Sequence, residues 1–428
     1  MSKVLLQKNF LKGRIRVPTS KSDLHRAIIC AMLSNGVSTI HPFDLSDDVF
    51  ATIEAARSLG ATVSIEKGKL TIDTSTMQSP NVPYDFRISC GESGSTLRFL
   101  IPVISALGYR SRFEGYGRLC YRPLDEYFEL LPQSGVTIIK KDHVSLPFYL
   151  SGKLLPGEFR IRGDISSQFI SGLLMALPLL NDSSKIILTT NLESARYVDM
   201  TLKTMSAFGV FAEQTDYGFF VPGGQTYKIC DYTVESDWSQ AAFFMAAGAI
   251  NGDLIIEGLT KDSTQGDCKA YDIMKQFGAN LEWQEDGSLR AVKSSLTGID
   301  IDATHVPDLV PIFSVMGACA KGKTVISGAS RLRLKESDRL KALRECLTKI
   351  GVKVTEQESG LIITGAGGFH GSRVKSFNDH RIVMSMAIAS VALHPKNSIE
   401  ITDSQAVNKS YPTFFEHFAS VGGIANVI

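Results

Sequence analysis

The chain has 428 residues, of which 44% are apolar and 21% charged, and this length and composition favour two ordinary globular domains of about 200 residues each. Its 45 Lys and Arg residues balance 44 Asp and Glu residues, which argues against nucleic-acid or membrane-surface partners because both bind a net basic face. The seven scattered cysteines include no C-x-x-C pair, so neither a disulfide framework nor a zinc site is indicated, and a reduced, cytoplasmic setting is expected.

The N-terminal segment MSKVLLQKNFLKGR contains no apolar run of signal-peptide length. The longest apolar stretches, near 169–180 and 241–250, are shorter than the roughly 20 residues that span a bilayer. We expect both stretches to be buried core helices.

Along the chain, one pattern recurs six times: an amphipathic helix, an apolar residue with a glycine, and then a β-branched strand. Glycine follows a helix readily because it adopts the left-handed backbone conformation at little cost. The intervals between these glycines run from 69 residues (209 to 278) to 75 residues (60 to 135). The marker glycines are Gly60, Gly135, Gly209, Gly278, Gly351 and Gly422.

A second pattern alternates with the first and consists of a strongly apolar helix, a turn and a strand. Its six instances begin AIICAML, FLIPVIS, ISGLLMA, AAFFMAA, LVPIFSV and RIVMSMA. Helices that are apolar around most of their circumference are buried, so the amphipathic helices of the first pattern should lie outside them. The two patterns together predict an α/β protein of six repeated helix–strand units, three in each domain.

Polar residues precede each of these apolar helices, in SKSDLHR, GESGSTLR, DISSQFI, SDWSQAA, VPDLVPI and FNDHRIV. The equivalent points are Lys21, Gly94, Ser167, Ser239, Asp308 and His380. A helix N-terminus offers unpaired N–H groups and partial positive charge, which together favour anions. Ordinary helix capping is the alternative, and for SDWSQAA the two interpretations stay equal. Capping does not explain the accompanying Lys21, Arg26, Arg98 and Arg381.

The amphipathic helices also begin with cations: Arg118, Arg122, Lys335, Arg339 and Lys409. A cation near a helix N-terminus opposes the helix dipole, so this group suggests that dianions neutralise it, and its size suggests two phosphorylated ligands. A solvated charged face is the alternative. The sequence has no P-loop or dinucleotide motif, and its eight histidines show no metal-ligand spacing.

The motifs KSDLHR, GESGSTLR, ISSQF, SARYVDMTL, VPDL, LKESDRL, NDHR and NKSYP resemble, in order and spacing, those of the 5-enolpyruvylshikimate-3-phosphate (EPSP) synthase family. The resemblance covers essentially the whole chain. It implies enolpyruvyl transfer from phosphoenolpyruvate to the 5-hydroxyl of shikimate 3-phosphate, in the pathway to chorismate and the aromatic amino acids. It also implies that no metal or organic cofactor takes part.

The fold implied by the resemblance is a two-domain inside-out α/β barrel. One domain comprises residues 1–18 and 235–428, the other residues 19–234, with crossovers near residues 19 and 234 and the active site in the cleft between the domains. We expect the protein to be a monomer whose partners are its two small substrates.

The resemblance also implies roles for individual residues. Shikimate 3-phosphate is expected to bind Lys21, Ser22, Arg26, Ser166, Ser167, Gln168, Ser194, Tyr197, Asp308, Arg331 and Lys335. Phosphoenolpyruvate is expected to bind Lys21, Gly94, Arg118, Gln168, Arg339, His380, Arg381 and Lys409. The expected catalytic residues are Asp308 as proton acceptor, Glu336 as proton donor to the methylene carbon, and Lys21.

The chemistry requires such a set independently. Protonation of the enol carbon creates a cationic centre that the hydroxyl attacks, and the adduct then loses phosphate. This needs an acid, a base and cations on the leaving group. Glu336 lies between Lys335 and Arg339, which would lower its pKa, so it can donate only if burial or substrate charge offsets those cations.

Two residues depart from the family pattern. Arg331 stands where the family usually has Asn, and we expect it to contribute to shikimate 3-phosphate binding. Glu92 also replaces a usual Asn, and we expect it to face solvent near a helix start rather than to repel phosphoenolpyruvate.

Two alternative functions remain open. One is the sister enzyme that transfers enolpyruvyl to UDP-N-acetylglucosamine, since Cys120 lies in the loop where that enzyme carries its catalytic cysteine. The other is a non-catalytic phosphate-binding repeat protein, although Lys21, Asp308, Glu336 and Lys409 are all present.

Overall fold

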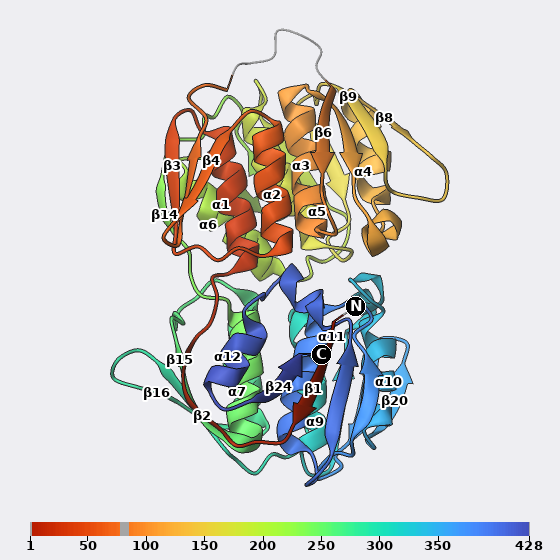
Figure 1. The fold of residues 1–428 in the computed structure, drawn as a ribbon. Coiled ribbons are helices and arrows are strands. Elements are labelled where there is room, and N and C mark those ends of the chain that lie inside the picture. Colours follow the sequence, from red (N-terminus) through yellow and green to blue (C-terminus); the bar gives the residue numbers. More distant parts are fainter. Residues whose placement is uncertain (1, 78–84, 428) are drawn as a thin grey trace. The chain divides into compact units, whose positions relative to one another are not determined.

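The computed structural model describes residues 2–77 and 85–427, and the chain divides into two compact units. The terminal unit comprises Met1–Pro18 and Glu235–Ile428, and the central unit comprises Thr19–Val234. Figure 1 shows that both units are built from the same parts, with helices inside and strands around them.

Within the described part of the central unit, three buried helices alternate with three more exposed ones. The buried helices are α1 (Lys21–Leu33), α3 (Gly94–Leu107) and α5 (Ser167–Ala176), and the others are α2 (Asp47–Ser58), α4 (Asp125–Leu130) and α6 (Ala195–Ala207). The sheets are, in strand order, β14 (Asp231–Thr233), β3 (Val37–His41), β5 (Lys69–Asp73) and β4 (Thr62–Glu66); β6 (Asp85–Ser89), β7 (Arg110–Glu114), β9 (Phe148–Gly152) and β8 (Val136–Lys140); and β10 (Glu158–Ile161), β11 (Ser184–Leu188), β13 (Gly218–Val221) and β12 (Glu213–Thr215).

The terminal unit repeats this plan. Its buried helices are α7 (Trp238–Asn251), α9 (Val310–Cys319) and α11 (His380–Ala389), and the others are α8 (Ala270–Gln276), α10 (Arg339–Lys349) and α12 (Phe414–Ser420). The sheets are β2 (Leu11–Arg16), β15 (Gly252–Glu257), β17 (Leu289–Val292) and β16 (Asn280–Trp283); β18 (Asp300–Asp302), β19 (Lys323–Ser327), β21 (Gly360–Thr364) and β20 (Lys353–Gln357); and β22 (Ser372–Lys375), β23 (Ser398–Thr402), β1 (Lys3–Gln7) and β24 (Ile424–Val427).

Across the described residues, all six four-stranded sheets share one topology. The first two strands pair in parallel, and the third and fourth add as antiparallel neighbours, as in β6–β7–β9–β8. A parallel pair needs a crossover connection, and in this sheet α3 supplies it. The prediction of an α/β fold with six repeated units is confirmed.

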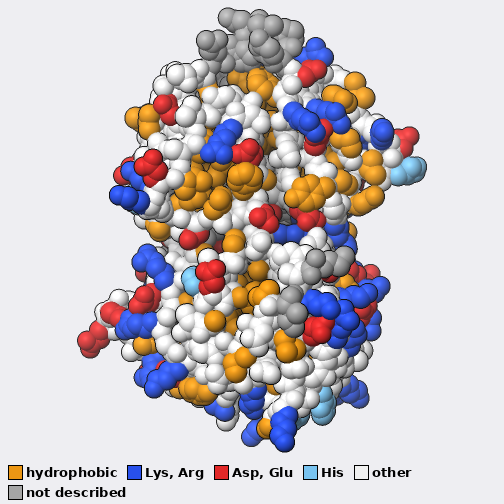
Figure 2. Space-filling model, viewed as in Figure 1, with side chains coloured by type: hydrophobic (Ala, Val, Ile, Leu, Met, Phe, Trp, Pro, Cys, Tyr) orange, Lys and Arg blue, Asp and Glu red, His pale blue; other side chains and the backbone are white. Residues whose placement is uncertain are grey.

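Each unit has its own hydrophobic core. In α7 every residue is buried, and in α3 all residues from Leu97 to Ala106 are, as expected for helices that are apolar around their circumference. The outer face drawn in Figure 2 carries Lys, Arg, Asp and Glu side chains interspersed over both units.

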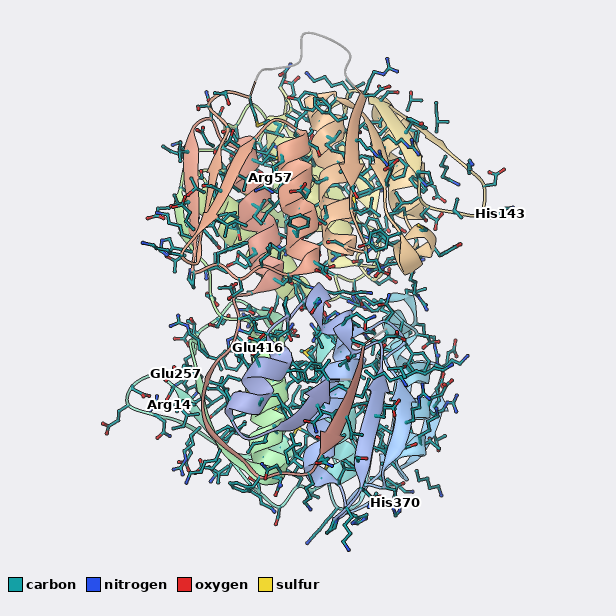
Figure 3. All side chains as sticks on the ribbon, viewed as in Figure 1. Arg14, Arg57, His143, Glu257, His370 and Glu416 are labelled. Carbon is teal, nitrogen blue, oxygen red and sulfur yellow. The ribbon has the colours of Figure 1, made fainter. Side chains whose placement is uncertain are left out.

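Strand exchange closes the terminal unit. β2 precedes α1 in sequence yet pairs in parallel with β15, whereas β14 precedes α7 yet pairs with β3. An ion pair of 2.7 Å between Arg14 of β2 and Glu257 of β15 accompanies the first pairing (Figure 3). β1 likewise completes the last sheet by pairing with β23 and β24.

The marker glycines all have left-handed backbone conformations, as predicted. Their φ angles lie between +75° at Gly209 and +104° at Gly60. A side chain at such a position strains the backbone by about 1–2 kcal/mol even where there is space for it.

Gly278→Ala should therefore destabilise the terminal unit more than Gly322→Ala. The φ angles match, at +92° and +90°, but a Cβ at Gly278 would lie 2.9 Å from the Ser295 carbonyl oxygen, whereas one at Gly322 would meet no atom within 4 Å. We expect a loss of about 1 kcal/mol for Gly322→Ala and at least about 1 kcal/mol more for Gly278→Ala.

Urea unfolding followed by tryptophan fluorescence measures this difference, because Trp238 and Trp283 both belong to the terminal unit and are the two tryptophans of the sequence. Equal losses of unfolding free energy in the two variants would contradict the steric argument.

Candidate functional site

The predicted helix starts are confirmed. Lys21, Gly94, Ser167 and His380 are the first residues of α1, α3, α5 and α11, while Ser239 is the second residue of α7. Asp308 lies in the short 3-10 helix η5 (Pro307–Leu309) that leads into α9. Caps occupy several of these starts as well: the side chains of Ser20, Ser93, Ser166, Asp237 and Asp379 accept backbone N–H groups.

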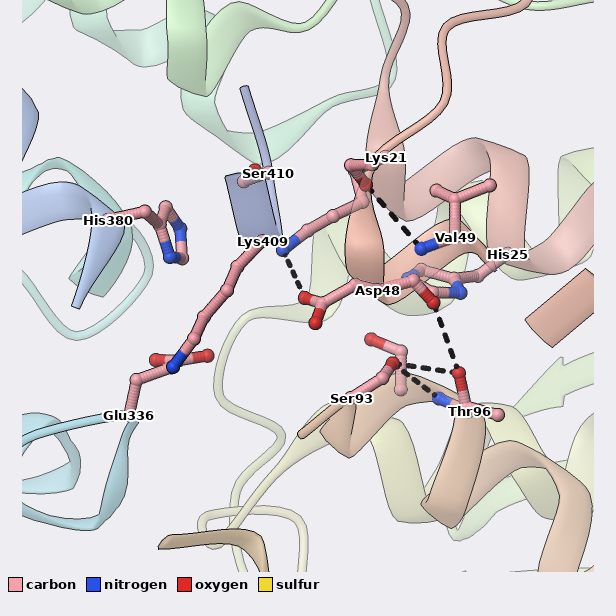
Figure 4. Close-up of polar contacts among 12 residues, drawn as sticks. Lys21, His25, Asp48, Val49, Ser93, Thr96, Glu336, His380, Lys409 and Ser410 are labelled. Carbon is pink, nitrogen blue, oxygen red and sulfur yellow. Dashed lines mark hydrogen bonds and ion pairs between the residues drawn. The ribbon is translucent and has the colours of Figure 1, made fainter. Parts of the chain in front are cut away.

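In the central unit, Lys21 pairs with a residue that the sequence analysis did not single out. Its Nζ lies 2.7 Å from Asp48 Oδ2 in the first turn of α2, and both side chains are mostly buried (Figure 4). Asp48 is favourably placed for the α2 dipole and holds the Lys21 ammonium at the start of α1.

A chain of buried hydroxyl groups joins the same helices. His25 Nδ1 lies 2.7 Å from Thr52 Oγ1, which lies 2.6 Å from Thr96 Oγ1, and Thr96 donates to Ser93 Oγ at 2.7 Å. Burial, together with Lys21 and Arg26, lowers the pKa of His25 well below its ordinary value, so its imidazole is neutral. These contacts link the N-terminal halves of α1, α2 and α3.

Arg26 is 2% exposed, and the contacts of its guanidinium lie inside the central unit. It donates to Thr201 Oγ1 at 2.7 Å, to the Ser22 carbonyl at 2.5 Å and to the Tyr197 carbonyl at 2.9 Å, and it lies over the ring of Phe99. Burial lowers its pKa to about 10, which leaves it charged at neutral pH. In this geometry Arg26 ties the start of α1 to that of α6.

Gln168, in α5, links that helix to α3 by hydrogen bonds. Its side chain donates to Ser95 Oγ at 2.9 Å and accepts from Arg98 Nη1 at 2.9 Å. Ser194, just before α6, adopts the left-handed conformation with a φ of +55°. A non-glycine residue in this region is strained, a feature that clusters at functional sites.

Gly94 lies against Arg122 and Arg98. A Cβ at Gly94 would come within 2.6 Å of Arg122 Nη1 and 3.0 Å of Arg98 Nη1. Arg122 is buried at the end of the 3-10 helix η1 (Gly117–Tyr121), whereas Arg118 within that helix is exposed. In the sequence Arg122 appears only as one of the cations at helix starts. It stands four residues from Arg118, so the local pattern does not show which of the two lies near Gly94.

Glu92 lies beside Gly117, where a Cβ would collide with its carboxylate, and its side chain is half-buried. Glu92 therefore packs against η1, the 3-10 helix that contains Arg118 and is followed by Arg122.

In the terminal unit, Asp308 is the centre of a cluster of cations. Its Oδ1 lies 2.8 Å from Arg339 Nη1, 3.4 Å from Lys335 Nζ and 3.8 Å from Arg381 Nε. Burial by itself would raise the pKa of Asp308, but Lys335, Arg381 and Arg339 together hold it well below its ordinary value. The carboxylate is therefore ionised at neutral pH.

Arg339, only 1% exposed, connects that cluster to two more carboxylates. Nη2 lies 2.7 Å from Glu336 Oε2, and Nε lies 2.8 Å from Asp379 Oδ2. Burial would lower its pKa, yet Asp379, Glu336 and Asp308 raise it above the ordinary value. Asp379 is fully buried and also accepts from Ser337 and from the Arg381 amide, so it joins α10 to α11.

The remaining predicted residues of this unit lie around the same helix starts. Arg381 Nη1 donates to the Asp308 carbonyl at 2.9 Å. Lys409, at the end of the 3-10 helix η8 (Ser404–Lys409), donates to the Asn378 carbonyl at 2.7 Å, just before α11. His380 is 1% exposed, with Nδ1 3.9 Å from Asp379. Arg331 Nη2 donates to the Thr304 carbonyl at 2.5 Å, in the segment that leads to Asp308.

Asp267 is a buried carboxylate that the sequence analysis missed. Ser239 donates to its Oδ2 from the start of α7, and the side chain is 2% exposed. Burial and the nearby Asp308 raise its pKa to about 6, against the opposing effect of Arg381. Only tertiary contacts bring Asp267 near Asp308, so no sequence signal marked it.

In the described residues, no group of three or more His, Cys, Asp or Glu side chains is arranged to hold a metal ion. None of the helices in residues 2–77 and 85–427 is both long enough and apolar enough to span a membrane.

Asp267→Asn should gain stability relative to the wild type as the pH rises. The folded protein holds the pKa of Asp267 at about 6, above its ordinary 3.8, so ionisation of this residue costs stability progressively between these values and fully above pH 6. From pH 4 to pH 7 the difference in unfolding free energy should shift by about 2 kcal/mol in favour of the variant, which bears no such charge.

Tryptophan-monitored urea unfolding at both pH values tests this, with Asp262→Asn, an exposed residue in the same segment, as the control. A difference between Asp267→Asn and the wild type that stays constant with pH would refute it.

The chain is similar to known proteins over its full length. The family model described as EPSP synthase (3-phosphoshikimate 1-carboxyvinyltransferase) matches residues 6–418. A 3-phosphoshikimate 1-carboxyvinyltransferase of Clostridium perfringens (strain 13 / Type A) is 44% identical over 425 residues, 99% of each chain. Another, from Clostridioides difficile (strain 630), is 43% identical over 426 residues, 96% of each chain.

Solved structures agree. EPSP synthase from Acinetobacter baumannii superposes with a TM-score of 0.84 at 27% identity, and the match covers 100% of both chains. The enolpyruvyl transferase NikO from Streptomyces tendae has a TM-score of 0.79 at 16% identity, covering 100% of this chain and 99% of its own, which shows a shared fold.

Proposed function

Because this chain belongs to the EPSP synthase family, we propose that it transfers the enolpyruvyl group of phosphoenolpyruvate to the 5-hydroxyl of shikimate 3-phosphate and releases phosphate. This reaction serves the synthesis of chorismate and the aromatic amino acids. The observation that carries the proposal is the Asp308 cluster, in which one ionised carboxylate is surrounded by Lys335, Arg339 and Arg381.

In this proposal Asp308 accepts the proton of the attacking hydroxyl. The three cations make Asp308 a weak base in the absence of substrates, because they stabilise its ionised form. Phosphate and carboxylate groups of the substrates compete for the same cations, which raises the basicity of Asp308 when both substrates are bound. The acid–base chemistry then depends on substrate binding.

Glu336 is the proposed donor to the methylene carbon. It is paired with Arg339 at 2.7 Å, an arrangement that favours its ionised form. Phosphoenolpyruvate would draw Arg339 away from Glu336 and so permit protonation. Lys21 is proposed to contact the enolpyruvyl group as it is transferred, and Asp48 orients the Lys21 ammonium.

The two substrates are assigned to the residues of the helix starts. Shikimate 3-phosphate is proposed to bind the positively charged Lys21 together with Ser22, Ser166, Ser167, Gln168, Ser194, Tyr197, Asp308 and Lys335. Phosphoenolpyruvate is proposed to bind Lys21, Gly94, Gln168, Arg339, His380, Arg381 and Lys409. We propose that shikimate 3-phosphate also binds Arg26 and Arg331. Arg26 is buried and donates to the Tyr197 carbonyl, and Arg331 donates to the Thr304 carbonyl in the segment that leads to Asp308.

Arg122 replaces Arg118 in the proposed phosphoenolpyruvate site. Arg122 lies against Gly94 at the start of α3, where an anion would meet both the helix N-terminus and a guanidinium. Arg118, in contrast, is an exposed residue of η1.

We further propose that the protein acts as a cytoplasmic monomer whose partners are its small substrates, without nucleic acid. The near-zero net charge, with charges of both signs interspersed on the face drawn in Figure 2, argues against a nucleic-acid partner.

The UDP-N-acetylglucosamine alternative is disfavoured by Cys120. Burial, with a contribution from Glu92, raises the pKa of its thiol, and Sγ donates to the Gly115 carbonyl at 3.3 Å. A catalytic cysteine needs a lowered pKa, because the thiolate is the nucleophile.

Phosphate release should require both substrates and Asp308. Wild-type protein mixed with phosphoenolpyruvate and shikimate 3-phosphate should release phosphate, and Asp308→Ala should lower kcat by roughly 100-fold or more, because the general base is lost. Release with UDP-N-acetylglucosamine in place of shikimate 3-phosphate would reassign the function, and no release with either acceptor would favour a non-catalytic binding protein.

Arg122→Gln should raise the KM for phosphoenolpyruvate far more than Arg118→Gln does. Loss of a buried, charge-assisted contact should raise that KM by roughly 10-fold to 100-fold, whereas loss of the exposed arginine should change it less than about twofold. Steady-state kinetics at saturating shikimate 3-phosphate measures both. The reverse order would restore Arg118 to the site.

A further inference from the structure

Lys335 and Glu336 lie on a short loop between the 3-10 helix η6 (Ser330–Leu334) and α10. Lys335 reaches Asp308 at 3.4 Å, and Glu336 reaches Arg339 at 2.7 Å. A loop has no helix or sheet ladder to fix it, so other contacts must hold these two side chains in place.

The far end of this loop is held by Asp379. Ser337 Oγ donates to Asp379 Oδ2 at 2.9 Å, and Arg339 Nε donates to the same oxygen at 2.8 Å. All three residues are buried. The residues that follow Glu336 are therefore anchored to the start of α11.

The near end is held by Arg333, two residues before Lys335. Its guanidinium donates to the carbonyl of Gln357, the last residue of β20, at 2.7 Å and to that of Glu358, in the turn between β20 and β21, at 3.1 Å. The same group donates to Glu356 Oε1 at 2.7 Å and to the α10 cap Asp338 at 3.1 Å.

This arrangement uses all three guanidinium nitrogens of Arg333. Nε and Nη2 bind the turn, while Nη1 bridges the carboxylates of Glu356 and Asp338. A planar, rigid fork can bind several acceptors in fixed directions, which a lysine ammonium on its flexible stem cannot. Arg333 thus joins three elements: η6, the β20–β21 turn and the cap of α10.

We propose that Arg333 is a positioning residue, which fixes the near end of the loop so that Lys335 and Glu336 meet the substrates. The proposal rests on the proposed function of these two residues. Arg333 acts through the loop, by the hydrogen bonds that hold its near end. With Asp379 at the other end, only the segment from 334 to 336 lies between the two anchors.

Arg344 provides a matched control. Its Nε lies 2.9 Å from Glu356 Oε2, so it pairs with the same carboxylate, and its side chain is 38% exposed against 30% for Arg333. Its described contacts do not include the turn carbonyls or Asp338. Arg344→Gln therefore removes one ion pair of this cluster and leaves the anchor of the loop intact.

Arg333→Gln should raise the KM for shikimate 3-phosphate roughly 10-fold and lower kcat by a similar factor, because small misplacements of catalytic groups are costly. Arg344→Gln should change either value less than about twofold, as for most exposed ion pairs. The KM and kcat of Arg333→Lys should lie between those of the two glutamine variants, because a lysine ammonium keeps one carboxylate contact but loses the planar guanidinium's other hydrogen bonds. Calorimetric titration of shikimate 3-phosphate, without turnover, should show the same order.

The experiment compares the wild type and all three variants, with the Tm of each recorded. A wild type that releases no phosphate would mean that the proposed function fails, independently of Arg333. An active wild type, with Arg333→Gln and Arg344→Gln impaired alike or not at all, would overturn the positioning role. If Arg333→Gln does not fold, the test uses Arg333→Lys instead. An Arg333→Lys variant with unchanged KM and kcat would then overturn the positioning role of Arg333.

Discussion

The terminal unit depends on one buried cation. Arg339 is almost inaccessible to water, and a desolvated guanidinium is stable only when carboxylates surround it. Asp308, Glu336 and Asp379 do so from η5, from the loop before α10 and from the start of α11. The electrostatic requirement of one side chain therefore sets the positions of three helix starts, and with them the groups proposed to react.

In the central unit, a different set of contacts holds the helix starts in place. Arg26 binds backbone carbonyls and hydroxyls, Gln168 bridges two helix starts, and Lys21 pairs with Asp48. These ties hold cations at helix N-termini, where the dipole is unfavourable to them. Anionic substrates would relieve this conflict, which explains why a chain of nearly zero net charge concentrates positive charge at these few positions.

The sheets explain how such helix starts are held. Each buried helix connects two parallel strands or follows an exchanged one, so a strand edge fixes the point at which the helix begins. The exchange of β2 and β14 leaves each unit with three complete sheets although the terminal unit is discontinuous in sequence. Loops then carry the cations, and contacts such as those of Arg333 hold the loops.

The sequence alone determined the six-fold repeat, the helix starts and the family, because helix periodicity, glycine after a helix and short motifs depend on neighbouring residues. Through the family resemblance it also assigned Asp308 and Lys335 to one expected substrate set, and Arg339 and Arg381 to the other. Only the tertiary structure decided that the buried Arg122 lies against Gly94, and that Asp48 lies beside Lys21 and Asp267 near Asp308. Such choices depend on burial and on contacts between residues far apart in the chain, which local sequence patterns do not record.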